Sequence, residues 1–438
     1  MNAERVILGE NAIYSTDCNK TGLNNNILVC GSSGCGKTMS ISEPRLLETY
    51  NTSLIATVTK RKLVHKYKPV FKQRGYVVED LNFICPSEST VAYDPLQYVC
   101  SYPDITFLAE SIVKSNPRKE RSNADPYWDD AAVSLLSAEI AYILMTADNP
   151  SFIDVLHFHD RLHIYEPVNR GDRITTSHDA LFRRLEKANP QCFAVSCWKS
   201  FGGLPIRTAH CVYSALNTSL DSVFSPELRQ MIAMENKIDF EQLATRKTVL
   251  FVSSSAVNPA LQYFVNMFYA QAFKTLFEYA ERLSDGRLPI PVHVLCDDFA
   301  TGGRILNFPE YISIFREKQI SVTLLLQSES QLESMYGSGD ATTIINNCDT
   351  YLYMGGMDLK TGHAISERLN VPLEEVLYMP IGREYVFRRG QRPIQTTRYD
   401  IRRNEMYQHI TKQYEHGVYR DDLSKGENEN YDDHERTA

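Results

Sequence analysis

The sequence predicts an α/β protein built on a mainly parallel central sheet, and three observations carry that prediction. Short apolar runs alternate with helix-forming segments, which is the rhythm of βαβ units. One of these runs leads directly into a glycine-rich loop of the phosphate-binding kind. The alternation then gives way to a long helix-rich stretch, after which strand-like runs return. We therefore expect one sheet-containing domain interrupted by a helical insertion.

The predicted strands fall into two groups. Each is a short, mostly apolar run with polar residues or glycine nearby, as expected for buried parallel strands. The first group covers residues 26–30, 53–57 and 75–80, with helices beginning after Lys37 and near Lys60. The second group covers residues 248–253, 292–296, 321–326 and 350–354.

The chain has 438 residues, which is more than a single core usually holds. Its middle part opens with apolar residues at helical spacing, at Ala132, Leu135, Leu136, Ile140 and Ile143. The expected division is a discontinuous nucleotide-binding domain in 1–125 and 241–410, an all-α domain in 126–240, and an acidic, disordered tail in 411–438.

Composition narrows the class of protein. A hydrophobic content of 43% and a charged content of 23% are typical of soluble globular chains. The net charge is −8, and residues 421–438 hold seven acids and two bases, which argues against a uniformly basic nucleic-acid coat. The ten cysteines form no Cys-x-x-Cys pair, which fits reduced thiols. No signal peptide or membrane-spanning run is recognisable, so we expect a cytoplasmic location.

The first apolar run ends in Gly-x-x-x-x-Gly-Lys-Thr, the P-loop motif. Its glycines let successive backbone N–H groups turn around phosphates, and the following helix adds its positive end. Lys37 is expected on the β- and γ-phosphates and the Thr38 hydroxyl on Mg²⁺. The predicted nucleotide-binding residues are Gly31, Ser32, Ser33, Gly34, Cys35, Gly36, Lys37 and Thr38.

The second half of the site is predicted at the end of the strand 292–296, expected to lie beside the P-loop strand. Asp297 would hold Mg²⁺, and Asp298 would polarise the attacking water. Gln327 follows the strand 321–326 and is a candidate γ-phosphate sensor. Arg316 precedes that strand by one helical turn, where an arginine could reach a neighbouring subunit's ATP or simply face solvent.

Two further clusters have open interpretations. Basic residues between Lys60 and Arg74, interleaved with Tyr67 and Phe71, could contact DNA phosphates or form a solvated helix face. Late-strand arginines could serve DNA or subunit contacts; they are Arg383, Arg388, Arg389, Arg392, Arg398, Arg402 and Arg403. The histidines of His157-x-His159-Asp160-x-x-His163 do not all share one helix face, which disfavours a metal site.

Ordered motifs over about residues 5–400 resemble the type IV secretion coupling proteins, the TraG-type conjugation ATPases. The resemblance rests on Tyr93-Asp94-Pro95, Asp125-Pro126-Tyr127-Trp128, Asp297-Asp298-Phe299-Ala300, Leu326-Gln327-Ser328, Ile345-Asn346-Asn347 and Gly390-Gln391-Arg392-Pro393, together with the P-loop. It implies a RecA-like motor with an inserted all-α domain that faces cargo. It further implies a homo-hexameric ring, ATP and Mg²⁺ as cofactors, and Asp298, Gln327 and Arg316 as catalytic residues, with Arg316 as the trans-acting finger.

Three departures from the family pattern stand out. The family usually begins with transmembrane helices, so membrane attachment of this chain would need a separate partner. The second acid is usually Glu, whereas Asp298 is one methylene shorter. An acidic segment after the second strand is replaced by Val58-Thr59-Lys60-Arg61-Lys62. The last two changes put normal ATP turnover in question.

Two functions from different classes remain. The first is an ATP-dependent DNA translocase that recruits relaxase-bound DNA and pumps it, as a single strand without base readout, to a type IV secretion channel. Its partners would be DNA, a relaxase or relaxosome protein, and a membrane-anchored channel subunit at the inner face of the membrane. The second is a non-hydrolysing, nucleotide-binding adaptor that recruits relaxase or an effector protein.

Overall fold

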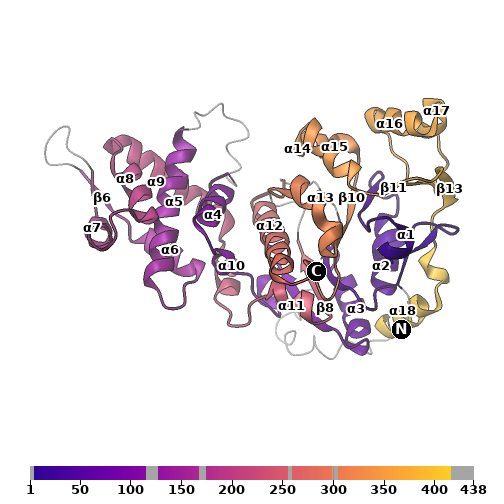
Figure 1. Cartoon of the computed structure of the whole chain (residues 1–438), viewed down its shortest axis with the longest axis horizontal. Coiled ribbons are helices and arrows are strands. Elements are labelled where there is room, and N and C mark those ends of the chain that lie inside the picture. Colours follow the sequence, from indigo (N-terminus) through magenta and orange to yellow (C-terminus); the bar gives the residue numbers. More distant parts are fainter. Residues whose placement is uncertain are drawn as a thin grey trace, which may run out of the picture.

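The computed structural model describes residues 4–114, 127–166, 174–254, 259–297, 299 and 304–415. Its centre is a nine-stranded sheet in the order β13-β12-β11-β3-β10-β9-β4-β8-β5. Neighbouring strands from β11 to β5 pair in parallel, and β12 and β13 add antiparallel pairs at one edge. The expected α/β class with a mainly parallel sheet is confirmed (Figure 1).

The strand bounds follow the apolar runs closely. The first group comprises β3 (Ile27–Cys30), β4 (Ser53–Val58) and β5 (Val77–Asn82). The second comprises β8 (Thr248–Ser253), β9 (Val292–Cys296), β10 (Ile320–Leu326), β11 (Thr350–Tyr353), β12 (Arg383–Arg388) and β13 (Ile394–Thr397). β5 starts two residues later than expected, because Gly75 has φ +76° and belongs to the turn that ends the preceding helix.

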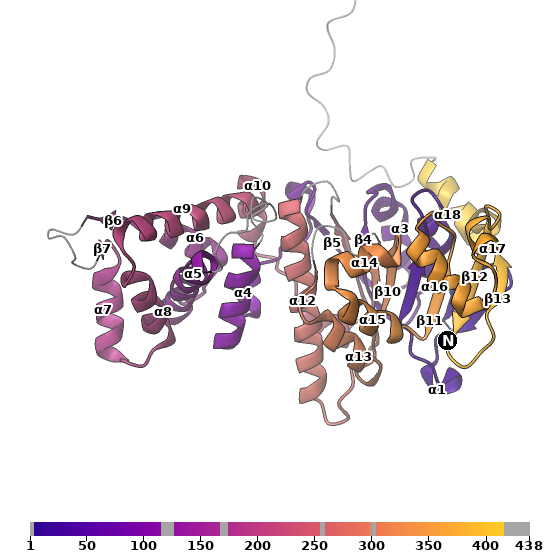
Figure 2. The same ribbon diagram turned by 90° about the horizontal axis from the view of Figure 1, so that it is seen from above.

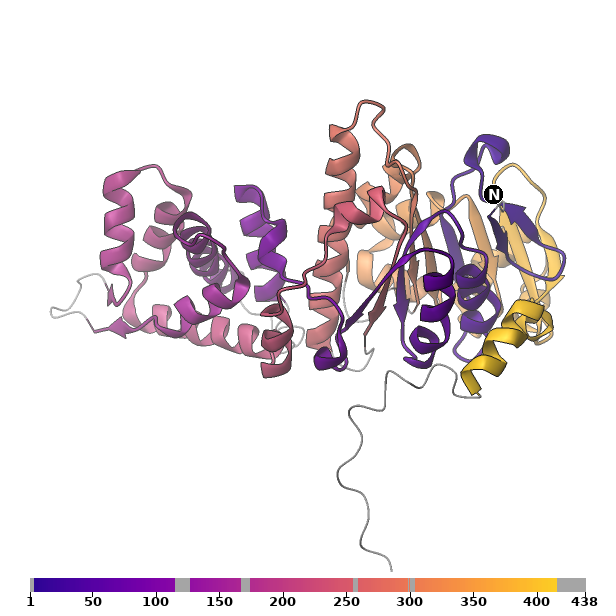
Figure 3. The ribbon, with the colours of Figure 1, turned by 90° about the horizontal axis from the view of Figure 1, so that it is seen from below.

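Both faces of the sheet are covered by helices, so its central strands are buried on both sides. One face carries α12 (Pro259–Arg282), α13 (Phe308–Lys318), α14 (Glu329–Tyr336) and α15 (Ser338–Asn346), seen in Figure 2. The other carries α2 (Glu43–Leu47), α3 (Lys62–Gln73) and α18 (Glu405–Glu415), seen in Figure 3. The alternation of β3 shows this directly, since Leu28 and Cys30 join one core cluster and Ile27 and Val29 the other.

The predicted helix-rich stretch lies to one side of the sheet, beyond α12 (Figures 1 and 2). Its helices are α4 (Tyr102–Lys114), α5 (Tyr127–Thr146), α6 (Phe152–Asp160), α7 (Asp179–Ala188), α8 (Phe193–Gly202), α9 (Ile206–Val223) and α10 (Pro226–Ile232). One short antiparallel pair, β6 (Ile164–Tyr165) with β7 (Thr175–Thr176), interrupts it. The apolar residues expected on α5 are all buried.

The chain enters and leaves this helical block at one point. Ala92 forms a parallel bridge with Lys237, and Ile238 N–H donates to the Ala92 carbonyl at 2.9 Å. The Asp94 carboxylate is fully buried and accepts hydrogen bonds from the Ser151 hydroxyl at 2.7 Å and the Lys237 ammonium at 2.8 Å. Asp94 therefore links the segments that enter and leave the helical block to the start of α6.

Two helices, α11 and α18, have bounds that bear on the expected division. α11 (Phe240–Thr245) leads back into β8, and α18 extends through Glu415, so the expected tail boundary at residue 411 falls inside a helix. The rest of that tail lies outside the described residues. The division into domains stays a prediction.

Within the described ranges, no helix is both long and apolar enough to cross a membrane.

Of the three histidines in the segment 157–163, His159 is buried and has a structural role. His159 Nδ1 lies 2.9 Å from both carboxylate oxygens of Glu139, and its Nε2 lies 3.0 Å from Asn217. Burial disfavours the charged imidazole, but the Glu139 charge and the hydrogen bonds to Glu139 and Asn217 outweigh it, so the pKa of His159 is raised. His157 and His163 are exposed and do not join this cluster.

Replacing Glu139 by Gln should lower the stability of the helical block by ~1–3 kcal/mol, because a charge-assisted hydrogen bond to a buried histidine is lost. A raised folded pKa stabilises the fold below the unfolded pKa of histidine, and that stabilisation is lost as pH rises through the folded pKa. The loss in Glu139→Gln should therefore be larger at pH 6 than at pH 8 in thermal unfolding. His157→Gln is the control, and an equal loss at both pH values would contradict the charge argument.

A second buried ionisable group lies on β12. The Glu384 side chain is fully buried between β13 and the N-terminal segment, and neither carboxylate oxygen has a hydrogen-bond partner among the described residues. Burial raises the pKa of Glu384 to about 8, against the lowering effect of nearby Arg398. The folded state therefore keeps a proton that the unfolded state releases at lower pH.

Because that folded pKa is raised, stability should fall as pH rises from the unfolded value of Glu towards 8. Glu384→Gln removes the titration and should stabilise the protein at pH 8 by ~2–4 kcal/mol relative to its effect at pH 5. Thermal unfolding at both pH values measures this. Glu375→Gln, at an exposed position on α17 (Leu373–Leu377), should show no such pH dependence. A pH-independent effect of Glu384→Gln would count against a buried neutral carboxyl.

Candidate nucleotide-binding site

The P-loop lies at the edge of the sheet where the parallel strands end, here called the carboxyl edge. Gly31 N–H donates to the Leu326 carbonyl at 3.1 Å, and Ser32 N–H donates to the Gly355 carbonyl at 2.9 Å. These bonds fix the loop to the ends of β10 and β11. The helix after the loop opens with a π-helical turn, Thr38–Ser42, before α2 begins.

Glycine is required at several positions of this loop. Gly34 and Gly36 have φ values of +75° and +90°, which residues with side chains rarely adopt. A Cβ atom at Gly31 would lie 2.7 Å from Cys35 Sγ and 2.9 Å from Met354 Cβ, so no side chain fits there. The backbone therefore forms the tight turn that presents N–H groups to an anion.

The side chains of Lys37 and Thr38 both lie at the P-loop. The Lys37 ammonium is buried and donates to the Gly31 carbonyl at 2.6 Å and to the Ser32 carbonyl at 3.2 Å, so it lies across the loop. The Thr38 hydroxyl donates to an Asp297 carboxylate oxygen at 3.2 Å. Thr38 and Asp297, 259 residues apart in sequence, thus meet at one point.

The Thr38–Asp297 pair fits a magnesium ion bound together with a nucleotide. A hydroxyl and a carboxylate are hard oxygen donors, and Mg²⁺ usually takes one or two such protein ligands and fills its shell with water and phosphate oxygens. The part of the chain that the structure describes contains no cluster of three or more His, Cys, Asp or Glu side chains able to hold a metal by themselves. Water and phosphate oxygens would complete the shell.

One expectation about strand order is wrong. β9, which delivers Asp297, does not lie beside β3; β10 lies between them, with Leu324 paired to both Leu28 and Cys296. Gln327 follows β10 directly, so the intervening strand places this residue between the P-loop and Asp297. Its side chain is exposed at the carboxyl edge, and its carbonyl lies 3.9 Å from Cys30 Sγ.

The other two candidates lie elsewhere. Asp298 lies outside the described residues. Arg316 is exposed near the end of α13, just before β10 begins, and so lies at the amino edge of the sheet, away from the P-loop of its own chain. It is close enough to Cys18 to oppose the rise that burial causes in the pKa of that thiol. The chain therefore does not bring Arg316 to its own nucleotide site.

Several side chains of the basic segment 60–74 form contacts within the chain. The Arg61 guanidinium makes two hydrogen bonds to the Asp80 carboxylate, at 2.7 and 2.8 Å, and Lys66 forms a buried pair with Glu43 at 3.1 Å. Tyr67 and Phe71 are fully buried and cannot stack on bases. The exposed basic residues that remain for DNA are Lys60, Lys62 and Lys72.

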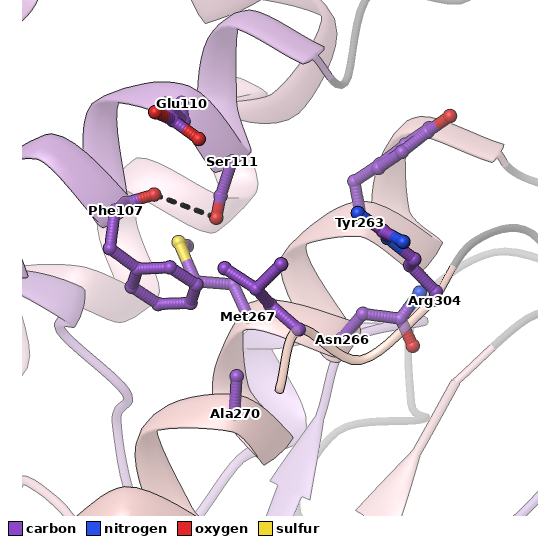
Figure 4. Close-up of a pocket in the computed structure, with 9 residues that line it drawn as sticks. Phe107, Glu110, Ser111, Tyr263, Asn266, Met267, Ala270 and Arg304 are labelled. Atoms are coloured by element: carbon purple, nitrogen blue, oxygen red, sulfur yellow. Dashed lines mark hydrogen bonds between the residues drawn. The ribbon is translucent and has the colours of Figure 1, made fainter. Parts of the chain in front are cut away.

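A separate cavity of about 140 Å³ opens between α4 and α12 (Figure 4). Phe107, Met267 and Ala270 supply apolar lining, and Asn266 and Arg304 add polar groups. The Asn266 side-chain N–H group is buried and has no hydrogen-bond partner among the described residues. The cavity lies where the helical block meets α12, so it is distinct from the P-loop site.

Sequence reasoning missed what lies against the other side of the P-loop. Met354 and Gly355, directly after β11, supply the wall that the loop packs against. Arg398 follows β13, and one of its terminal nitrogens lies 3.8 Å from the position that a Cβ of Gly36 would take. The only signal in the sequence was its membership of the late-strand arginine cluster, which did not point to this loop.

Comparisons with solved structures agree with this architecture. The coupling protein TrwB in complex with a non-hydrolysable ATP analogue, ADPNP, matches with a TM-score of 0.62 and 17% identity over 86% of this chain and 85% of that one. TrwB with ADP and Mg²⁺ matches with a TM-score of 0.62 and 18% identity over the same shares. VirB4 of Thermoanaerobacter pseudethanolicus matches with a TM-score of 0.55 and 13% identity over 91% and 97%. At these identities the likeness shows the fold, which confirms a RecA-like core.

A comparison with curated proteins gave no match. The family model described as Type IV secretory system Conjugative DNA transfer matches residues 2–370. That range contains the P-loop, Asp297, Gln327 and Arg316, and it spans most of the chain. The chain therefore belongs to the type IV secretory system conjugative DNA transfer family.

Proposed function

We propose that this protein is an ATP-dependent coupling protein that recruits relaxase-bound DNA and moves it towards a type IV secretion channel. The observation that carries the proposal is the meeting of Lys37, Thr38 and Asp297 at one edge of the sheet, with Gln327 on the strand between. This arrangement supports binding of ATP with Mg²⁺, hydrolysis with Asp298 as the water-activating acid, and γ-phosphate sensing by Gln327.

In this proposal, a neighbouring subunit completes the nucleotide site by supplying an arginine. Arg316 faces outward at the amino edge and is available to a second copy, which supports a ring in which each subunit supplies its arginine finger to the next. The proposed assembly is a homo-hexamer. Single-stranded DNA would be gripped through its phosphates by exposed lysines such as Lys60, and the helical block would face the relaxase.

The proposed place of work is the inner face of the cell membrane, where a membrane-anchored channel subunit would hold the ring. A non-hydrolysing adaptor is the second candidate, because Asp298 is shorter than the usual Glu and basic residues replace the acids after β4. The contacts of Arg61 indicate that the fold accommodates this replacement. Its positive charge is balanced by Asp80 at 2.7 Å and Glu88 at 3.6 Å.

Steady-state ATP hydrolysis, measured with and without single-stranded and double-stranded DNA, separates the two functions. DNA should stimulate turnover, and Lys37→Ala should lower it at least ~100-fold because a phosphate-stabilising charge is removed. Asp298→Asn should lower turnover while keeping ATP binding. Lys187→Ala, at an exposed lysine on α7 and away from the P-loop and the basic segment 60–74, is the matched control. ATP binding without turnover under every DNA condition would reject the motor and favour the adaptor.

Mixing two inactive variants tests Arg316 separately. Arg316→Ala keeps an intact P-loop and lacks the finger, whereas Lys37→Ala keeps the finger and lacks the site. Mixed assemblies should recover part of the DNA-stimulated turnover, because a Lys37→Ala subunit can serve its neighbour's nucleotide. No recovery, in samples whose mixed oligomers are verified by size, would reject a trans-acting Arg316.

A further inference from the structure

Arg398 is the late-strand arginine that approaches the P-loop. β12 and β13 pair antiparallel in sequence after β11, so β13 runs in the same direction as β3 and ends at the carboxyl edge. Arg398 is the first residue after β13, and its N–H donates to the Gly382 carbonyl at 2.9 Å. The strand hairpin therefore returns a cation to the edge that holds the nucleotide loop.

One hydrogen bond and one close approach place the guanidinium beside the P-loop. One terminal nitrogen donates to the Met354 carbonyl at 3.2 Å, on the segment that walls the P-loop. The other lies 3.8 Å from the Cβ position of Gly36, the residue directly before Lys37. The Glu384 carboxyl is fully buried, and the positive charge of Arg398 lowers its pKa against the larger raising effect of burial. These contacts restrict where the side chain can point.

What Arg398 lacks is an anion. No described side chain forms an ion pair with it, its Nε is buried without a hydrogen-bond partner, and Glu384 makes no hydrogen bond to it. Three other arginines of its cluster do have acidic partners: Arg389 pairs with Asp349 at 3.1 Å, Arg402 with Asp400 at 2.8 Å, and Arg403 with Glu10 at 3.9 Å. A partly buried guanidinium against a phosphate-binding loop is a strong donor to phosphate oxygens.

We infer that Arg398 is a further nucleotide-binding residue, which donates hydrogen bonds to the phosphate chain of the nucleotide held by the P-loop. It acts within its own chain, from the side of the loop opposite Asp297. The inference rests on the proposed function, because it requires that the loop binds a nucleotide. It differs from the role proposed for Arg316, which serves a neighbouring subunit.

Calorimetric titration of the full chain with ADP and Mg²⁺, and separately with inorganic pyrophosphate and Mg²⁺, tests the inference. Arg398→Ala should weaken binding of both ligands about tenfold or more, as for loss of one charge-assisted contact. Arg398→Gln keeps a donor for the Met354 carbonyl but not the charge, and should be equally weak. Arg398→Lys should recover part of the affinity. Arg392→Ala, at an exposed arginine between β12 and β13, is the matched control.

The outcomes are distinct. If Arg398→Gln binds like the unsubstituted chain, the side chain only supports Met354 and the inference is overturned. Weaker binding of ADP with unchanged binding of pyrophosphate would also overturn it, because the contact would then not be to phosphate. Thermal unfolding without ligand checks that each variant is folded. An unsubstituted chain that binds neither ligand would reject the proposed function and the inference together.

Discussion

The parallel register of β3, β10 and β9 is the constraint on which the site depends. Because Leu324 pairs with Leu28 on one side and Cys296 on the other, the three strands end level with one another. The P-loop, Gln327 and Asp297 are each the next residues along those three strands. A slip in either pairing would separate the Thr38 hydroxyl from the Asp297 carboxylate, so the hydrophobic pairing of buried strands sets the geometry of the polar site.

The two edges of the sheet have different chemistry. The carboxyl edge gathers the loop, an acid and Arg398, whereas the amino edge exposes Arg316 without a described acidic partner. A molecule whose complementary groups lie on different surfaces associates head to tail rather than face to face. Such contacts close into a ring when the rotation between neighbours allows it, which agrees with the assembly proposed above.

The strands of the sheet, and the positions of the P-loop, Asp297 and Gln327 at the ends of strands, could be predicted because they depend on local sequence pattern. Continuous apolar runs define buried strands, and the P-loop, Asp297 and Gln327 each follow such a run directly. Strand order could not be predicted, since nothing in the run 320–326 says that it lies between two others. Arg398 was missed for a related reason: its place depends on a hairpin, β12–β13, that turns the chain back across two strands.

The chain enters and leaves the helical block at a single point, which has a consequence for how such proteins can diversify. The bridge between Ala92 and Lys237 brings the two ends of the helical block together, so the segment between them starts and finishes at the same place in the fold. Asp94 sets the condition for exchange, because its buried charge requires a helix start and a lysine from whatever segment replaces the present one. A different helical segment could thus follow the same sheet if it kept a serine and a lysine at these two positions.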